Sequence, residues 1–175
     1  KPEEIIETIA SFKKALFGEN LKYEIPSSPY NRVTSSSSAQ ASSKEIKGEL
    51  IGGNLAILTS MLGSKSQLKT ENKILFIEEI GEYKYSIDRM LQSLKRAGYF
   101  TKVNAVIVGD MSLIKKNTTN WGSSIEQLIL DVIPEDIPVL FDFPAGHEAE
   151  NRAMIFGRVI KLAVGSEQYS VIFEN

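Results

Sequence analysis

Short apolar runs alternate with amphipathic segments through the middle of the chain. Two nearly continuous apolar runs, at residues 73–77 and 103–108, are typical of strands that are buried on both faces of a sheet. Between them, residues 85–97 place apolar side chains at helical spacing, and Gly98 follows as a helix terminator. Because this alternation continues to a further apolar run at residues 138–141, we expect parallel strands joined by right-handed crossovers.

Weaker patterns at both ends extend this core. Residues 3–17 repeat Ile, Phe and Leu at helical spacing and predict an amphipathic helix. The other predicted elements are strands at 21–25 and 46–51, helices at 55–62 and 123–132, and a closing hairpin of strands at 159–164 and 169–173. These flanking strands indicate added antiparallel or barrel-like elements.

One segment lacks any such pattern. Residues 27–44 are rich in Ser, Pro and Asn, and Ser35 to Ser38 form an unbroken row. Because this composition cannot bury a core, we interpret the segment as a long flexible loop. With no internal repeat and no second boundary, residues 1–175 are expected to form a single domain.

Composition and charge exclude several classes of protein. The 175 residues are 42% apolar and 24% charged, which is typical of a globular domain, and the net charge of −2 argues against nucleic-acid binding. The chain has no cysteine, so disulfides and thiolate chemistry are excluded. No apolar run approaches a membrane span, and no signal peptide precedes the first helix, so we expect a cytoplasmic protein without membrane contact. Because the chain begins with Lys1 and not with Met, we expect it to come from a longer parent.

The apolar run at residues 73–77 is followed by two carboxylates, Glu78 and Glu79. Ligands and catalytic groups collect at the carboxyl ends of parallel strands, and a glutamate there can orient an imidazole and stabilise its charged form. The alternative is that either carboxylate caps the next helix or faces solvent, and from the residues alone this alternative is favoured for any single Glu because acids at strand ends are common. Neighbouring strand residues point to opposite faces, so Glu78 and Glu79 are expected to have different roles.

His147 is the only histidine, and it follows the strand predicted at residues 138–141. The neighbouring Pro144 and Gly146 predict a shaped turn. Histidine is the usual general base near neutral pH, although a lone histidine is more often a structural or surface residue. Its position after a buried strand adds modest support for the catalytic interpretation.

Several familiar motifs are missing. No Gly-x-Ser-x-Gly nucleophile motif, Walker A motif or HExxH pattern occurs in the chain. Gly52-Gly53-Asn54 is a weak candidate for a phosphate loop, and we interpret it first as a strand-to-helix turn that requires glycine.

Five short motifs in a fixed order resemble the C-terminal domain of the LD-carboxypeptidase family, which includes murein tetrapeptide carboxypeptidases and microcin C immunity peptidases. The resemblance spans about residues 45–165. The motifs are Gly52-Gly53-Asn54-Leu55, Ile74-Leu75-Phe76-Ile77-Glu78-Glu79, Ile87-Asp88-Arg89-Met90-Leu91, Val106-Ile107-Val108-Gly109-Asp110 and Pro144-Ala145-Gly146-His147.

The resemblance implies an α/β fold, namely a swivelling β/β/α domain with a partly parallel central sheet and flanking helices. It gives Glu78 and His147 two positions of a Ser–Glu–His triad, with the serine in an N-terminal domain that has no counterpart here. Residues 1–20 would form the connecting helix. The implied parent is a homodimeric serine carboxypeptidase that cleaves murein tetrapeptides or related peptides in cell-wall recycling without a cofactor or metal.

Two other functions are open to this sequence. The first is a non-catalytic interaction or substrate-recognition domain, which the acidic residues Glu148 and Glu150 beside His147 would suit. The second is a nucleotide-binding domain, which would depend only on Gly52-Gly53-Asn54. A hydrogen bond between Glu78 and His147 would favour the hydrolase over the non-catalytic domain, and absence of nucleotide binding in a thermal-shift screen would dismiss the nucleotide-binding domain.

Overall fold

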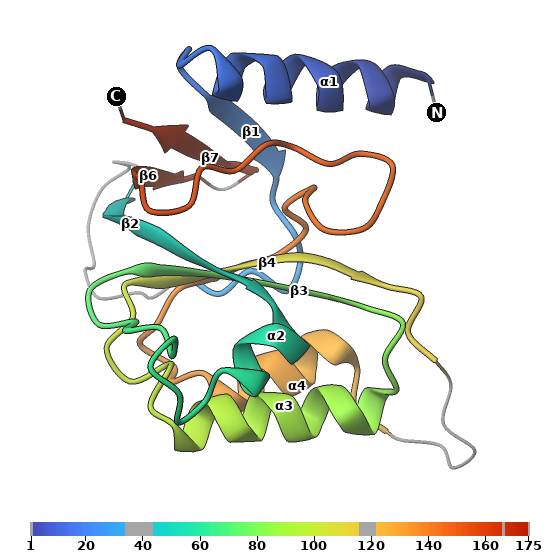
Figure 1. Cartoon of the computed structure of the whole chain (residues 1–175), viewed down its shortest axis with the longest axis vertical. Helices are drawn as coiled ribbons and strands as arrows, with labels where there is room; N and C mark the ends of the chain where they lie inside the picture. Colours follow the sequence, from blue (N-terminus) through green and yellow to red (C-terminus); the bar gives the residue numbers. More distant parts are fainter. Residues whose placement is uncertain (1, 34–43, 116–121, 166, 175) are drawn as a thin grey trace.

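Seven strands form one sheet in the computed structural model, which describes residues 2–33, 44–115, 122–165 and 167–174 (Figure 1). Their order across the sheet is β1-β7-β6-β2-β3-β4-β5. The strands are β1 (Lys22–Pro26), β2 (Lys44–Asn54), β3 (Ile74–Ile80), β4 (Ala105–Ser112), β5 (Val139–Leu140), β6 (Val159–Val164) and β7 (Gln168–Phe173). The helices are α1 (Pro2–Leu16), α2 (Leu55–Ser60), α3 (Lys84–Arg96) and α4 (Ile125–Val132).

The long strand β2 joins a parallel half of the sheet to an antiparallel half. Its first half pairs antiparallel with β6, and its second half pairs parallel with β3. Beyond β3, the strands β4 and β5 are also parallel, as the alternation of strand and helix predicted. On the other side β6, β7 and β1 are antiparallel, which confirms the predicted closing hairpin.

The molecule is built in layers around this sheet. Helices α2, α3 and α4 cover one face of the parallel half, and strands β1, β6 and β7 lie on the opposite side (Figure 1). One apolar core fills the space between the helices and the parallel strands, and a second lies between the two halves of the sheet. This arrangement is the β/β/α architecture that the resemblance implied.

The predicted elements are all present, with shifted boundaries. The main difference is that β3 does not end at Ile77 but continues to Ile80, so Glu78 and Glu79 lie within the strand. Strand β3 can extend beyond the apolar run at residues 73–77 because the carboxylates of Glu78 and Glu79 are hydrogen-bonded where they are buried. The Ser-rich segment predicted as a flexible loop falls largely on residues 34–43, outside the described residues.

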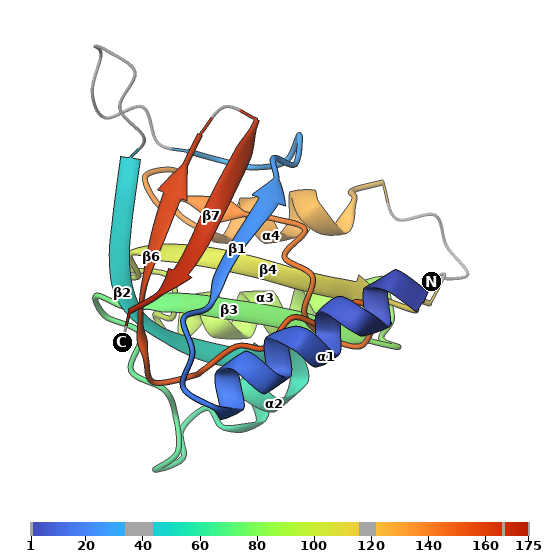
Figure 2. The same cartoon turned by 90° about the horizontal axis from the view of Figure 1, so that it is seen from above.

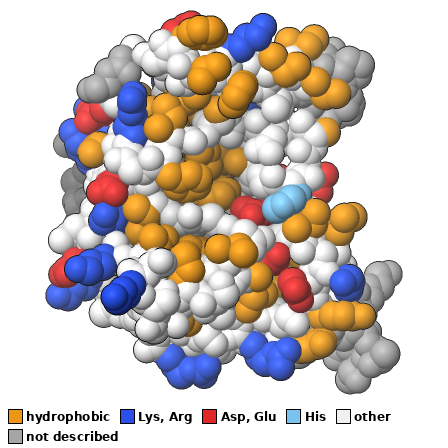
Figure 3. All heavy atoms as spheres, in the orientation of Figure 1, with side chains coloured by type: hydrophobic (Ala, Val, Ile, Leu, Met, Phe, Trp, Pro, Cys, Tyr) orange, Lys and Arg blue, Asp and Glu red, His pale blue; other side chains and the backbone are white. Residues whose placement is uncertain are grey.

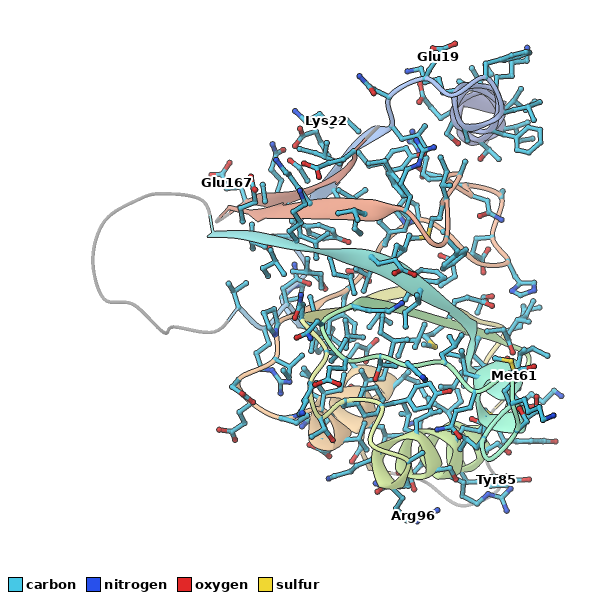
Figure 4. The ribbon with its side chains drawn as sticks, turned by 60° about the vertical axis from the view of Figure 1, so that its left-hand side comes forward. Glu19, Lys22, Met61, Tyr85, Arg96 and Glu167 are labelled. Carbon is cyan, nitrogen blue, oxygen red and sulfur yellow. The ribbon has the colours of Figure 1, made fainter. Side chains whose placement is uncertain are left out.

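Helix α1 stands apart from the helical layer. It crosses the molecule on the side of β1 (Figure 2), and Figure 4 views it almost along its axis, far from Tyr85 and Arg96 of α3. Ser11 on α1 is buried, whereas Ile9 is 48% exposed and Phe12 is 60% exposed. The helix therefore turns polar side chains toward the protein. None of the described helices is long and apolar enough to cross a membrane.

Candidate active site

Glu78 and His147 meet at the carboxyl edge of the parallel strands. Glu78 Oε2 lies 2.8 Å from His147 Nδ1, so the predicted contact between the two side chains is confirmed. The side chain of Glu78 is 8% exposed and that of His147 is 44% exposed, and the imidazole is visible at the surface in pale blue in Figure 3. A buried carboxylate thus holds one edge of an imidazole whose other edge faces outward.

The hydrogen bond determines what the free edge of the imidazole can do. An ionised carboxylate only accepts hydrogen bonds, so Nδ1 of His147 donates to Glu78 and Nε2 keeps its lone pair. Nε2 makes no hydrogen bond to any residue within the described ranges. It can therefore accept a proton from a group that approaches from outside.

An irregularity between β3 and β4 lies directly beside Glu78. Ile77 pairs with Val108 but Glu79 pairs with Met111, so β4 contains one extra residue in this stretch. The extra residue places Gly109 and Asp110 opposite Glu78. Such bulges often redirect side chains next to active sites, and here the bulge brings Asp110 to the His147 turn.

Glu79 has a different role from Glu78, as the alternation of strand side chains predicted. Its carboxylate accepts hydrogen bonds from Asn54 Nδ2 at 3.0 Å and from the backbone N–H of Ala56 at 2.9 Å. A carboxylate at the first turn of α2 is favourable because the N–H groups there lack partners within the helix. Glu79 therefore anchors α2 to β3, on the opposite face from His147.

Asp110 supports the turn that carries His147. Its Oδ2 accepts the backbone N–H of Glu148 at 3.3 Å, and its own N–H donates to the Ala145 carbonyl at 2.9 Å. Gly146 lies between these contacts with φ of 149°, and a Cβ there would lie 2.8 Å from Asp110 Cβ. Only glycine allows this close approach without strain.

Asn151 closes the same turn from the other side. Its side chain donates to the Gly146 carbonyl at 2.9 Å, and its backbone N–H donates to Thr8 Oγ1 at 2.8 Å. Thr8 Oγ1 in turn donates to the Ala149 carbonyl at 3.2 Å. The turn is thus fixed between the edge of the sheet and α1.

The charges around the turn are mostly negative. Burial raises the pKa of the Asp110 carboxyl above its ordinary value, and the nearby charges of Glu148 and Glu78 raise it further against the opposing effect of the backbone N–H groups. Arg152 neutralises part of this charge, because its Nη2 lies 2.6 Å from Glu150 Oε1 and its Nη1 lies 2.8 Å from Glu7 Oε2. Of the acidic residues after His147, Glu150 therefore has a cationic partner.

Two grooves border the site. One, of about 450 Å³, contains Glu78 and is lined by apolar side chains that include Phe12, Phe76 and Phe156. The other, of about 480 Å³, lies beyond the turn and is lined by the carboxylates of Asp110, Glu126, Asp142, Glu148 and Glu150. The Glu78–His147 pair thus stands between an apolar groove and an acidic groove.

Gly52, Gly53 and Asn54 do not form the separate turn that was predicted but are the last paired residues of β2, which leads directly into α2. Asn54 caps α2 by accepting the Ile57 N–H at 3.2 Å, and a Cβ on Gly52 would lie 1.9 Å from the Phe76 carbonyl oxygen. Close packing against β3 thus explains Gly52, whereas Gly53 has open space around it and a φ of 142° that favours glycine. No group of three or more His, Asp or Glu side chains that could hold a metal ion occurs among the residues that the structure describes.

Three supporting residues were not predicted from the sequence. Asp110 ends one of the five motifs and Asn151 follows another closely, but no role was predicted for either residue. Thr8 carried no signal, because it lies 141 residues before Ala149, its partner in the turn. Such contacts form only when the fold brings distant segments together.

Comparison with known proteins places these features in context. Residues 47–162 match the family model described as the LD-carboxypeptidase C-terminal domain. The chain is 36% identical over 129 residues to a probable murein peptide carboxypeptidase of Bacillus subtilis, covering 73% of this chain and 40% of that protein. It is 28% identical over 121 residues to the murein tetrapeptide carboxypeptidase of Pseudomonas aeruginosa, covering 68% and 39%. The chain thus spans about two fifths of the length of these two relatives.

Solved structures share the fold. A muramoyltetrapeptide carboxypeptidase from Oxalobacter formigenes aligns with a TM-score of 0.79 at 22% identity, over 97% of this chain and 55% of that one. The microcin C7 self-immunity protein MccF aligns with a TM-score of 0.74 at 23% identity, over 100% and 57%. In both cases this chain covers little more than half of the solved protein.

Proposed function

The chain belongs to the LD-carboxypeptidase family, and from this membership we propose that it supplies the general base and its orienting carboxylate to a serine carboxypeptidase. The substrate would be a murein tetrapeptide or related peptide that ends in a D-amino acid. The observation that carries the proposal is the 2.8 Å contact between buried Glu78 and exposed His147.

The chemistry follows from the two side chains. His147 Nε2 would take the proton from a serine hydroxyl as the oxygen attacks the carbonyl carbon of the last peptide bond. Glu78 would hold Nδ1 and stabilise the imidazolium that forms. His147 would then return the proton to the leaving amino group, which departs as the D-amino acid, and water would release the peptide from the serine ester.

The serine would come from a second domain of the parent protein. The chain spans about two fifths of its curated relatives and matches the model of a C-terminal domain, which supports this division. Without that domain we expect no hydrolysis, because the covalent route requires the nucleophile. A homodimer and a cytoplasmic location stay predictions.

The test uses the two-domain protein and a murein tetrapeptide, with release of the terminal D-alanine as the readout. We expect His147→Ala to lower kcat by roughly 10⁶-fold because it removes the base. Glu78→Gln should lower kcat by roughly 10⁴-fold because it misorients the base. Glu71→Gln is the matched control, since Glu71 is an exposed carboxylate near the opposite end of β3. Activity that survives His147→Ala would disprove the assignment.

The same geometry argues against a non-catalytic role. In a domain that had lost its chemistry, Glu78 and His147 would have no need to remain paired. The 2.8 Å contact and the outward Nε2 instead preserve what a base requires.

A further inference from the structure

Helix α1 exposes a continuous apolar face. Its large outward residues, together with the one that follows the helix, are between 48% and 75% exposed: Ile5, Ile6, Ile9, Phe12, Leu16 and Phe17. On the opposite side of the helix Ser11 is only 4% exposed. An amphipathic helix is normally buried on its apolar face, so the orientation of α1 is reversed with respect to this domain.

Polar contacts hold the helix in this orientation. Ser11 Oγ accepts the Ala153 N–H at 3.0 Å, Thr8 bonds the His147 turn, and Glu7 pairs with Arg152 at 2.8 Å. Ala15 adds a partly buried apolar contact. Since a helix of this length is marginal by itself and contiguous apolar patches are rare on free surfaces, the outer face is suited to a second body.

The exposed face continues into the candidate active site. Phe12 and Thr8 line the same groove as Glu78, and the groove reaches Gly146 beside His147. Figure 3 shows apolar side chains over the region of α1 on the same side of the molecule as the histidine. A body that presents a hydroxyl to His147 Nε2 across this groove would therefore lie against α1.

We propose that the outer apolar face of α1 is the docking surface for the domain that carries the nucleophile, an inference that rests on the function proposed above. That domain would present an apolar patch beside its nucleophilic hydroxyl. This occupant is favoured over a second copy of the chain because the groove joins α1 to Glu78, and because the chain matches only the C-terminal domain of its family. The bonds from Thr8 to the His147 turn and from Ser11 to Ala153, just after it, would make docking on α1 also fix that turn.

Cysteine labelling tests this proposal without relying on activity. The chain has no native cysteine, so Ile6→Cys and Ile9→Cys each introduce one thiol on the outer face of α1. Glu135→Cys is the control, because Glu135 is exposed between α4 and β5, on the opposite layer of the molecule. The rate of N-ethylmaleimide addition is followed by peptide mass, in this chain alone and in the two-domain protein.

In the chain alone we expect the α1 thiols to react as fast as the control thiol. In the two-domain protein they should react at least about tenfold more slowly, because labelling then requires the docked face to open, while the control is unchanged. Equal reactivity of α1 thiols in both proteins would overturn the proposal. So would slower labelling in the isolated chain as its concentration rises, since a second copy would then cover α1. Neither result depends on whether His147 is the catalytic base.

Discussion

Helices α1 and α3 have similar amphipathic patterns but opposite orientations in the fold. In α3 the apolar residues Ile87, Leu91 and Leu94 are fully buried against the sheet. In α1 the apolar side chains face solvent, and the helix is held through Thr8 and Ser11. Periodicity thus predicts that a helix forms and which residues share a face, but not which face the domain covers.

The helical layer and the side of the molecule that carries α1 are stabilised by different kinds of contact. The helical layer rests on a large apolar core between α2, α3, α4 and the parallel strands. The His147 turn and α1 are joined mainly by hydrogen bonds and by the Arg152 ion pairs. We expect substitutions on these two sides to differ in size and in the segments that they affect.

The largest effect on stability is expected for Leu91→Ala on α3. Leu91 is fully buried, so the substitution leaves a cavity and should lower the free energy of unfolding by about 2–5 kcal/mol. Urea unfolding of this chain measures the change. A loss below about 1 kcal/mol would show that the helical layer is less tightly packed than its burial indicates.

An intermediate and local effect is expected for Ser11→Ala on α1. The substitution leaves the Ala153 N–H without its 3.0 Å partner, which should lower the local free energy of opening by about 1–3 kcal/mol. Hydrogen exchange should become faster in α1 and at residues 149–153 while α3 is unchanged. Uniformly faster exchange across the chain would contradict the idea that α1 and the turn are one unit.

A smaller effect is expected from the charge of Asp110. Its folded-state pKa is raised above the ordinary value of 3.8, so the folded protein binds this proton more tightly than the unfolded chain. The associated stability is present below pH 3.8 and is lost as the pH rises through the raised pKa, although solvent exposure limits its size.

Asp110→Asn isolates this effect because the amide oxygen can still accept the Glu148 N–H. Urea midpoints of both proteins would be compared at about pH 3.5 and about pH 6.5, where the wild type should lose stability relative to the variant as the pH rises. A constant difference between the two proteins would show that Asp110 titrates as in the unfolded chain.

The smallest effect is expected for Ile9→Gln on the outer face of α1. Ile9 is 48% exposed, so the free energy of unfolding of this chain should change by no more than about 0.5 kcal/mol. Thermal unfolding of the isolated chain measures it. A loss comparable to that of Leu91→Ala would mean that the apolar face of α1 is already packed in this chain.

Much of the fold follows from local patterns. The apolar runs at residues 73–77 and 103–108 predicted β3 and β4, and the helical spacing at residues 85–97 predicted α3. Glu78 and His147 were identified from their positions after such runs, and the contact between them followed from the motifs shared with a known family. These features are predictable because each depends on neighbouring residues or on a short motif.

The amino-acid sequence alone therefore specifies the elements, the parallel half of the sheet and the two candidate catalytic side chains. The bulge beside Glu78, the support of the His147 turn by Asp110, Asn151 and Thr8, and the outward face of α1 appear only in the folded molecule. They depend on contacts between residues far apart in the chain, and no local pattern encodes which distant surface a side chain will meet.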